Sequence, residues 1–288
     1  MNLAAYLELC KPKIVLMLGL TALVGMLLSV NFYTNILPGL ISLVGFILLA
    51  SSSAAFNQIF DKDLDKNMVR TKDRPVASGA LKLSHALVFS FLLFLSGCFL
   101  LYQYSNILTL SLTVFGFVFY GIIYTLFLKW STPQNIVIGG FSGALPPLIG
   151  WTAINNEISL MPIILVAVIF LWTPPHFWPL AIHRIEDYKK EKVPMMPVAK
   201  GIKRTKVEMV IYALLLTITS TTPYFYGLAG EIYFFSTLAL NLIFLFLCFG
   251  YLTDQENKKS MQIFNFSVWY MFLFFSMTYI DFLIYLDV

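Results

Sequence analysis

The stretch Asn57-Gln-Ile-Phe-Asp61-Lys-Asp63-Leu-Asp65 closes a run of apolar and small residues at positions 38–60. The run is long enough to cross a bilayer as one helix, so a membrane helix is expected to end in a group of carboxylates. On a continuous helix Asn57, Asp61 and Asp65 drift only about 40° around the axis and rise about 6 Å per step. Their oxygens therefore line one face of the helix, whereas Asp63 points away from it.

Three oxygen ligands on one face repel one another unless a cation lies among them. An oxygen-only set suits Mg2+, which binds through one or two carboxylates together with substrate phosphates. The loop that follows supplies Arg70, Lys72 and Arg74, which are close enough in sequence to hold the other side of an anion. The stretch therefore predicts a metal–diphosphate site at the membrane mouth. The alternative is a solvated loop of mixed charge.

Composition places the whole chain in the membrane. Of its 288 residues, 59% are hydrophobic and 12% are charged, which indicates a polytopic membrane protein and not a soluble domain. The net charge of +4 requires no nucleic acid, because membrane proteins keep lysine and arginine on their cytoplasmic side. The chain begins without a basic leader and cleavage site, so the first span is expected to be retained, in a bacterial plasma membrane.

Hydropathy predicts an all-α protein with nine transmembrane helices in a single membrane domain, residues 1–288, with polar cytoplasmic caps at about 61–84 and 183–206. The fifth span is rich in glycine and proline and is expected to pack closely and to be kinked. All 19 lysines and arginines fall before the first span or after an even-numbered span. The positive-inside rule therefore predicts a cytoplasmic N-terminus. The nine spans cover roughly residues 12–30, 38–60, 85–102, 107–128, 134–152, 161–182, 207–226, 232–252 and 263–285.

A second polar region follows the sixth span and reads Trp172-Thr-Pro-Pro-His176-Phe-Trp178-Pro-Leu-Ala-Ile-His183-Arg184-Ile-Glu186-Asp187-Tyr188. A histidine near the end of an apolar span is costly unless it is paired or functional. His176 is therefore either a ligand or acid–base group, or a histidine satisfied by a backbone carbonyl that Pro174 and Pro175 leave open. His183 lies at the water boundary, where solvation alone could account for it.

The sequence resembles the UbiA superfamily of intramembrane prenyltransferases, and within it the members that act on protohaem IX. The resemblance spans positions 11–197. Many members of the superfamily carry a second pair of aspartates after the sixth span, whereas this chain has Arg184, Glu186, Asp187 and Tyr188 at that place. A second metal held by two aspartates is therefore not predicted. The matching blocks are Lys11-Pro-Lys-Ile-Val, Leu20-Thr-Ala-Leu-Val-Gly-Met-Leu27, Asn57-x-x-x-Asp61-x-x-x-Asp65, Asn67-Met-Val-Arg70-Thr71-Lys-Asp-Arg74-Pro75, Tyr124-Thr-Leu, Thr132-Pro-Gln-Asn135-Ile-Val-Ile-Gly-Gly140, Gly143-Ala-Leu-Pro-Pro-Leu-Ile-Gly-Trp151, Trp172-Thr-Pro-Pro-His176-Phe-Trp178, Asp187-Tyr188 and Pro194-Met-Met-Pro197.

The resemblance implies a UbiA-like fold, in which the helices surround a central cavity that opens to the cytoplasmic side. It also implies Mg2+-dependent transfer of a farnesyl group from farnesyl diphosphate to the vinyl group of protohaem IX (haem B), through an allylic carbocation, to give haem O. The implied metal ligands are Asp61, Asp65 and Asn57. The cations implied to neutralise the leaving diphosphate are Arg70, Lys72 and Arg74. The residues implied to bind substrate are His176, His183, Arg184, Asp187, Tyr188 and Asn135.

Two other functions share part of this pattern. The first is prenylation of a quinone-precursor aromatic ring, which needs the first acidic motif but not the region around His176. The second is an ion-coupled transporter, although its coupling acids would be expected near the bilayer midplane and not at the cytoplasmic mouth. The partners expected for the favoured function are farnesyl diphosphate, haem B and membrane lipid, with no nucleic acid, and a haem A synthase or terminal oxidase assembly downstream.

Overall fold

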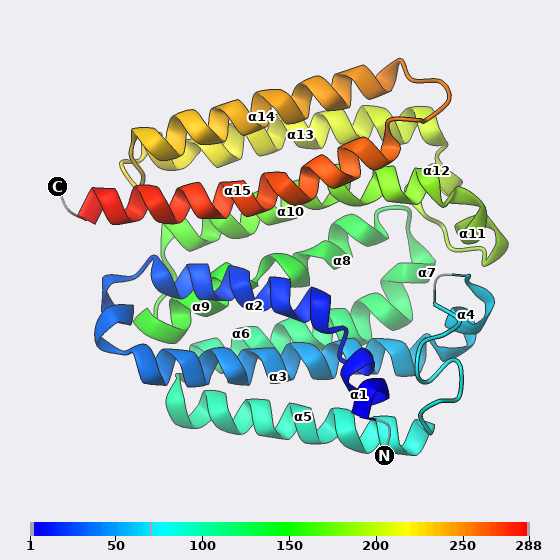
Figure 1. Cartoon of the computed structure of the whole chain (residues 1–288), viewed down its shortest axis with the longest axis horizontal. Helices are drawn as coiled ribbons and strands as arrows, with labels where there is room; N and C mark the ends of the chain where they lie inside the picture. Colours follow the sequence, from blue (N-terminus) through cyan, green and yellow to red (C-terminus); the bar gives the residue numbers. More distant parts are fainter. Residues whose placement is uncertain (1–2, 70, 287–288) are drawn as a thin grey trace. The chain divides into compact units, whose positions relative to one another are not determined.

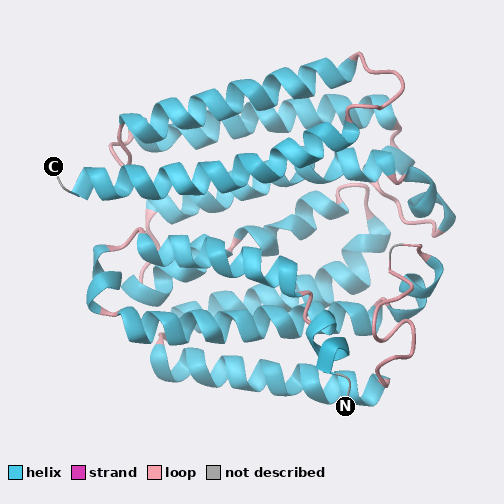
Figure 2. Ribbon diagram, viewed as in Figure 1, coloured by secondary structure: helices cyan, strands magenta, loops and turns pink. Residues whose placement is uncertain are grey.

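The computed structural model describes residues 3–69 and 71–286, and within these residues the chain is helical without a β-strand (Figure 2). The chain divides into two compact units. The first comprises Met1–Ser131 and Leu145–Ile158, and the second comprises Thr132–Ala144 and Ser159–Val288. Because the chain passes into the second unit, back into the first and out again, neither unit is one continuous segment. The single membrane domain expected from the sequence stays a prediction.

The first unit contains the end of the apolar helix from which the sequence analysis started (Figure 1). Its helices include a 3₁₀ helix, η1, and a π-helix, η2. They are α1 (Leu3–Leu9), α2 (Pro12–Leu27), η1 (Val30–Thr34), α3 (Ile36–Phe60), α4 (Lys62–Asn67), α5 (Leu83–Tyr104), α6 (Ile107–Val118), η2 (Phe119–Leu128), α7 (Lys129–Ser131) and α9 (Pro146–Asn155).

The second unit contains the histidine region, and its long helices α10, α13, α14 and α15 pack against one another (Figure 1). Its helices are α8 (Asn135–Ala144), α10 (Leu160–His183), α11 (Ile185–Lys190), α12 (Met196–Ala199), α13 (Ile202–Phe225), α14 (Glu231–Leu252) and α15 (Ser260–Leu286).

The described residues form seven helices that are long and apolar enough to cross a membrane, or eight if α1 and α2 are one bent span. The predicted count of nine is not confirmed. The remaining predicted span falls on α13, which has 24 residues but carries charges in its first turns and the polar run Thr217-Ile-Thr-Ser-Thr-Thr222. These residues lower its hydropathy below that of the other long helices. The multi-pass, all-α class is confirmed, whereas the central cavity stays a prediction.

Glycine allows two helices of the first unit to approach very closely. A Cβ added to Gly25 in α2 would lie 2.1 Å from the carbonyl oxygen of Pro147, and one added to Gly150 in α9 would lie 1.9 Å from that of Ala22. Small residues serve such backbone contacts between membrane helices, as the composition of the fifth span predicted. The helix of that span is interrupted at Leu145, because α8 ends at Ala144 and α9 starts at Pro146, and the kink itself stays a prediction.

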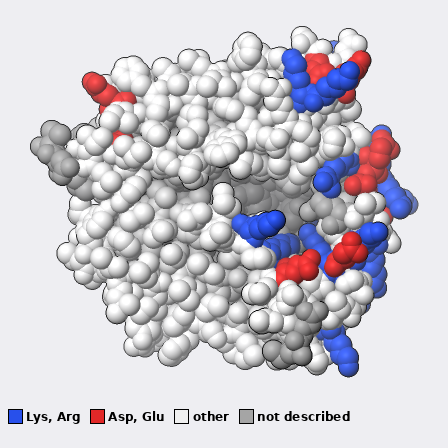
Figure 3. All heavy atoms as spheres, in the orientation of Figure 1, with Lys and Arg blue, Asp and Glu red and all other residues white. Residues whose placement is uncertain are grey.

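Lysine and arginine side chains gather at one end of the helices in each unit (Figure 3). In the first unit this end carries α4 and the loop after it, and in the second unit it carries α11, α12 and the connection from α14 to α15. Long apolar helices with their cations at one end are typical of membrane proteins that follow the positive-inside rule.

Candidate functional site

The end of α3 brings the three predicted oxygen ligands into the protein interior. The Asp61 amide donates to the carbonyl oxygen of Asn57 at 2.9 Å, and the Asp65 amide donates to that of Asp61 at 2.7 Å. The helical spacing therefore continues across the junction between α3 and α4. Asn57, Asp61 and Asp65 are 4%, 5% and 2% exposed, so their oxygens do not point into open solvent. Asp63 is exposed, as expected, and pairs with Lys66.

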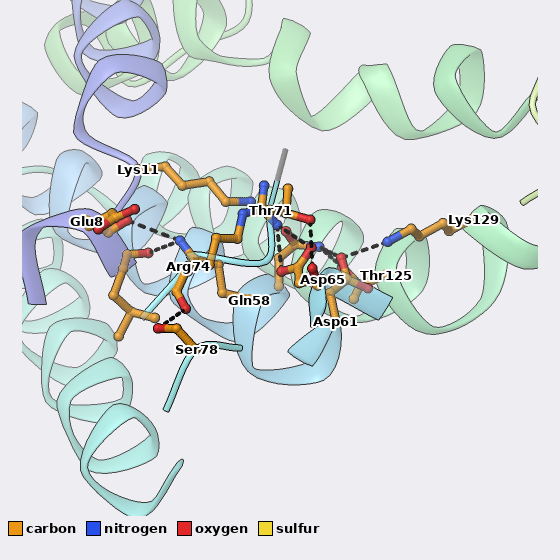
Figure 4. Close-up of polar contacts among 12 residues, drawn as sticks. Glu8, Lys11, Gln58, Asp61, Asp65, Thr71, Arg74, Ser78, Thr125 and Lys129 are labelled. Atoms are coloured by element: carbon orange, nitrogen blue, oxygen red, sulfur yellow. Dashed lines mark hydrogen bonds and ion pairs between the residues drawn. The ribbon is translucent and has the colours of Figure 1, made fainter. Parts of the chain in front are cut away.

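The Asp61 carboxylate is held by a lysine from a distant part of the first unit (Figure 4). The Nζ atom of Lys129, the first residue of α7, lies 2.8 Å from Asp61 Oδ2. The side-chain amide of Asn57 donates to the same carboxylate oxygen at 2.8 Å. Both side chains of the ion pair are largely buried, so the attraction is screened less than at a protein surface.

A second lysine contacts the amide oxygen of Asn57. Lys11, at the start of α2, donates from Nζ to Asn57 Oδ1 at 2.5 Å and reaches the hydroxyl of Tyr120 at 3.4 Å. The Asn57 amide nitrogen also donates to Thr125 Oγ1 at 3.1 Å. The orientation of the amide is thus fixed, with its oxygen toward a cation and its nitrogen toward acceptors.

The third oxygen ligand, Asp65, is held by Arg74. One guanidinium nitrogen, Nη1, donates to Asp65 Oδ1 at 2.8 Å and to Oδ2 at 2.7 Å. Thr71 fixes the backbone of the same residue by donating its hydroxyl to the Asp65 carbonyl at 3.2 Å. Charge-assisted bonds of this kind are stronger than neutral ones, and the loop after α4 is anchored by them to the carboxylate.

The π-helix η2 contributes Tyr120 and Thr125, which contact Lys11 and Asn57 of this cluster. Its wider turn lets Thr125 Oγ1 donate to the carbonyl oxygen of Tyr120, five residues earlier, at 2.8 Å. The rings of Tyr120 and Tyr124 stack at 5.6 Å with an interplanar angle of 8°. π-Helical turns occur frequently at functional sites. Here the turn presents a hydroxyl to Asn57 and ends next to Lys129, which pairs with Asp61.

The donor set fits a hard divalent cation. It consists of two carboxylates and one amide oxygen, all buried and all already next to side-chain positive charge. Such oxygen ligands are those that Mg2+ prefers. Residues 3–69 and 71–286 contain no group of three or more histidine, cysteine, aspartate or glutamate side chains able to hold a metal. The Asn57 oxygen is therefore needed to make a third protein ligand.

The cations around the cluster differ from those that the sequence suggested. Arg74 is present, but Lys72 is exposed, and Arg70 lies outside the described residues. Sequence reasoning missed Lys11 and Lys129 as members of the cluster. Both stand at the charged end of an apolar span, and this was the available signal, although it does not say which oxygen ligand each contacts.

In the second unit, His176 of α10 is held between two aromatic rings. Its ring centroid is 4.1 Å from that of Trp172, at an interplanar angle of 13°, and 4.8 Å from that of Phe264, at 24°. Its Nδ1 atom lies 2.6 Å from Ser267 Oγ on α15. The partner is therefore a side-chain hydroxyl from another helix, and not a backbone carbonyl opened by the neighbouring prolines.

The other predicted substrate-binding residues lie along the same unit. His183 is exposed at the end of α10, and Arg184 is half-buried at the junction with α11. In α11, Asp187 is half-buried and Tyr188 is buried. Asn135 is fully buried at the start of α8, which packs against α10.

Comparison with known sequences gives one consistent result. The sequence profile described as the UbiA prenyltransferase family matches residues 18–276. A protein named protoheme IX farnesyltransferase from Psychromonas ingrahamii is 43% identical over 276 residues, which are 96% of this chain and 89% of the relative. A protein named protoheme IX farnesyltransferase 2 from Vibrio campbellii is 42% identical over 272 residues, or 94% of this chain and 90% of the relative.

Solved structures share the fold at low sequence identity. A structure from work on digeranylgeranylglyceryl phosphate synthase in membranes superposes with a TM-score of 0.83 at 23% identity, covering 97% of this chain and 98% of that one. A UbiA homolog from Archaeoglobus fulgidus bound to DMAPP and Mg2+ superposes with a TM-score of 0.67 at 17% identity, covering 95% and 98% of the two chains.

Proposed function

Because the chain belongs to the UbiA prenyltransferase family and is an intramembrane prenyltransferase, we propose that it transfers the farnesyl group of farnesyl diphosphate to the vinyl group of protohaem IX (haem B) and so forms haem O. Relatives with this name are similar over almost the whole chain. The structural observation that carries the proposal is the buried cluster of Asn57, Asp61 and Asp65, in which each oxygen ligand faces a side-chain cation.

These three residues are proposed to hold Mg2+ through the Asn57 amide oxygen and the two carboxylates. When bound, Mg2+ neutralises charge on a diphosphate and assists its departure. The buried position of the ligands makes the interaction strong, because nearby water would otherwise screen it. Asn57 is already oriented for this role, since Thr125 and Asp61 accept from its nitrogen and leave its oxygen directed at positive charge.

Lys11 and Lys129 are proposed to serve the diphosphate. In the structure each ammonium group lies against an oxygen that the metal would also need. With a divalent ion on those oxygens, both amines can turn toward the phosphate oxygens and neutralise the charge that develops as the diphosphate leaves. Arg74 is proposed to keep Asp65 in place. Roles for Arg70 and Lys72 remain proposals from the sequence.

The bond between farnesyl C1 and the diphosphate oxygen breaks, the diphosphate leaves with the bonding electrons, and an allylic cation remains. The terminal carbon of the haem vinyl group then forms a bond to C1, and the positive charge moves to the vinyl carbon next to the porphyrin. Water adds to that carbon and releases a proton, which gives the hydroxyethylfarnesyl group. Aromatic faces stabilise a cation and keep water away. Tyr120 and Tyr124, stacked beside Lys11, are the aromatic residues of the first unit that we propose for this task.

The haem-binding residues proposed in the second unit are His176, His183, Arg184, Asp187, Tyr188 and Asn135. Arg184 suits a haem propionate, because its half-buried guanidinium pairs with no carboxylate within the described residues.

We further propose a bacterial plasma membrane location with a cytoplasmic N-terminus, since the relatives come from bacteria and all lysines and arginines lie on one side of the predicted spans. Delivery of haem O to a haem A synthase or a terminal oxidase assembly completes the proposal.

The test is product formation by the purified protein supplied with haem B, farnesyl diphosphate and Mg2+, followed by mass spectrometry. Haem O is expected from the native protein. Asp61→Asn is expected to lower the rate by about 10²–10³-fold, as loss of one preorganised electrostatic group does elsewhere. Asp63→Asn is the matched control, because Asp63 is exposed on the adjoining turn. Prenylation of a quinone-precursor ring in place of haem, or full activity of Asp61→Asn, overturns the proposal.

A further inference from the structure

The chain has three histidines, His85, His176 and His183, and they differ in how firmly the structure orients their rings. His85 is exposed in the first turn of α5, and His183 is exposed at the end of α10. Neither imidazole ring makes a hydrogen bond within the described residues. His176 is fixed on both ring faces by Trp172 and Phe264, and at one ring nitrogen by Ser267.

The hydrogen bonds around Ser267 determine which ring nitrogen of His176 carries a proton. Ser267 Oγ lies 2.6 Å from the carbonyl oxygen of Phe264, and a carbonyl can only accept. The single hydroxyl proton of Ser267 is used in that bond. Ser267 Oγ must therefore accept from His176, so Nδ1 carries the hydrogen in the bond of 2.6 Å. In the neutral ring the lone pair is then on Nε2.

The geometry leaves that lone pair accessible. His176 is half-buried, its two ring faces are covered by Trp172 and Phe264, and Nε2 is not among the fully buried side-chain atoms without a partner. Nε2 has no hydrogen-bond partner in the part of the chain that the structure describes. The clamp is reinforced between helices, since the Trp172 indole nitrogen donates to the Ser267 carbonyl at 3.0 Å. α10 and α15 thus hold one imidazole in one orientation.

From this arrangement we propose that His176 Nε2 binds the iron of the haem substrate, and that Ser267 is the positioning residue that sets its tautomer. The inference rests on the proposed function, because that function makes haem the substrate. A ligating histidine ordinarily donates its other ring nitrogen to an acceptor, which orients the ring and makes the free nitrogen a better ligand. An axial histidine is a usual ligand of haem iron. Ligation here fixes the porphyrin, and hence its vinyl groups, against α10.

The experiment is a titration of the purified full chain with haemin in the absence of farnesyl diphosphate, followed by optical and electron paramagnetic resonance spectra. Native protein is expected to show an imidazole–iron signature. His176→Ala and His176→Gln are expected to lose it and to bind haemin about 100-fold more weakly. The glutamine variant retains a side-chain donor for Ser267, so it guards against misfolding. Added free imidazole is expected to restore the signature in His176→Ala.

Ser267→Ala is expected to keep the signature but to weaken haemin binding about tenfold, because the tautomer is no longer set. Metal-free protoporphyrin IX is expected to bind native protein and His176→Gln equally, and His85→Ala serves as the matched exposed control. An unchanged signature in both His176 variants, or its loss in His183→Ala alone, overturns the inference and leaves the proposed function intact. Failure of the native protein to bind haemin or form haem O overturns both.

Discussion

The ends of α3 and α10 resemble each other in outline and differ in chemistry. Each long apolar helix stops, and a six-residue helix follows it at once, α4 after α3 and α11 after α10. In the first pair, Asp61 and Asp65 are buried and each is bound by a cation. In the second pair, the polar group is a half-buried imidazole between aromatic rings, and the acids of α11 are exposed or half-buried.

The difference shows how one local architecture can serve two ligands. Buried carboxylates are stable only with positive charge beside them, so the end of α3 suits a divalent ion and a diphosphate. A neutral imidazole needs no counter-ion, so the end of α10 suits a transition metal such as haem iron. In α11 the acid Glu186 pairs with Lys189 on the surface, where ion pairs contribute little. The second region is therefore not expected to hold Mg2+.

The largest effect expected from this comparison is that of removing divalent ions. EDTA should lower prenyl transfer at least about a thousandfold, because the metal contributes several kcal/mol to stabilising the leaving charge. The same treatment should leave the haemin spectrum of the second region unchanged. The rate of haem O formation and the optical spectrum of bound haemin are measured on the same samples. Added Mg2+ is expected to restore the rate. Activity that survives EDTA, or a haemin spectrum that changes with it, would contradict the separation.

The next largest effect compares one acid after each helix, Asp65 after α3 and Asp187 after α10. Asp65→Asn should lower the rate about 10²–10³-fold, since it removes a proposed metal ligand. Asp187→Asn should cost no more than about tenfold, because Asp187 is half-buried and is expected to act only around bound haem. Steady-state rates at saturating Mg2+ measure both. Equal losses in the two variants would indicate a second metal site and would remove the distinction between the regions.

The two regions should also differ in how much their ion pairs contribute to the stability of the protein. Arg74→Lys retains the charge but loses the nitrogen that contacts both Asp65 oxygens, and it should lower the free energy of unfolding by about 1–3 kcal/mol. Lys189→Ala breaks the corresponding exposed pair in α11 and should change it by less than about 1 kcal/mol. Thermal unfolding in detergent without Mg2+ compares the two, and a larger loss in Lys189→Ala would refute the assignment of buried and exposed pairs.

The part of this comparison that the sequence predicts is local. The apolar run at 38–60 predicts α3 to within two residues at its start and correctly at its end. Four-residue spacing predicts that Asn57 and Asp61 share a face, because helix geometry fixes neighbours along one segment. The same logic places Asp63 outside the cluster.

The remaining features of the two sites depend on contacts between segments that are far apart in the sequence, and the sequence does not show which of these segments meet. Lys129 lies 68 positions after Asp61, and Ser267 lies 91 positions after His176, so no local pattern indicates either pair. The π-helical turn of η2 is likewise set by packing, since its sequence reads as an ordinary apolar span. Loop cations such as Lys72 looked suitable only because they are near in sequence, and Lys72 is exposed.

The smallest predicted effect concerns how Lys11 is held beside Asn57. Gln58, which is 2% exposed, donates from Nε2 to the carbonyl oxygens of Glu8 and Leu9, each at 3.1 Å. These carbonyls end α1, immediately before the 53° bend at which Lys11 adopts a left-handed φ of 50°. The hydrogen bonds of Gln58 thus connect the bend that carries Lys11 to α3, the helix that carries Asn57.

Gln58→Leu should lower kcat/KM for farnesyl diphosphate about two- to tenfold, the effect of losing an ordinary hydrogen bond that positions a charged group. The loss should appear in kcat as well as in KM, because Lys11 is proposed to turn toward the phosphate oxygens and to neutralise the charge that develops as the diphosphate leaves. The unfolding temperature should change little, since leucine also removes the buried Oε1 atom, which has no partner within the described residues. Gln103→Leu, an exposed change on α5, is the control. A rise in KM with kcat unaltered would limit Lys11 to ground-state binding and would contradict its proposed role in the bond-breaking step.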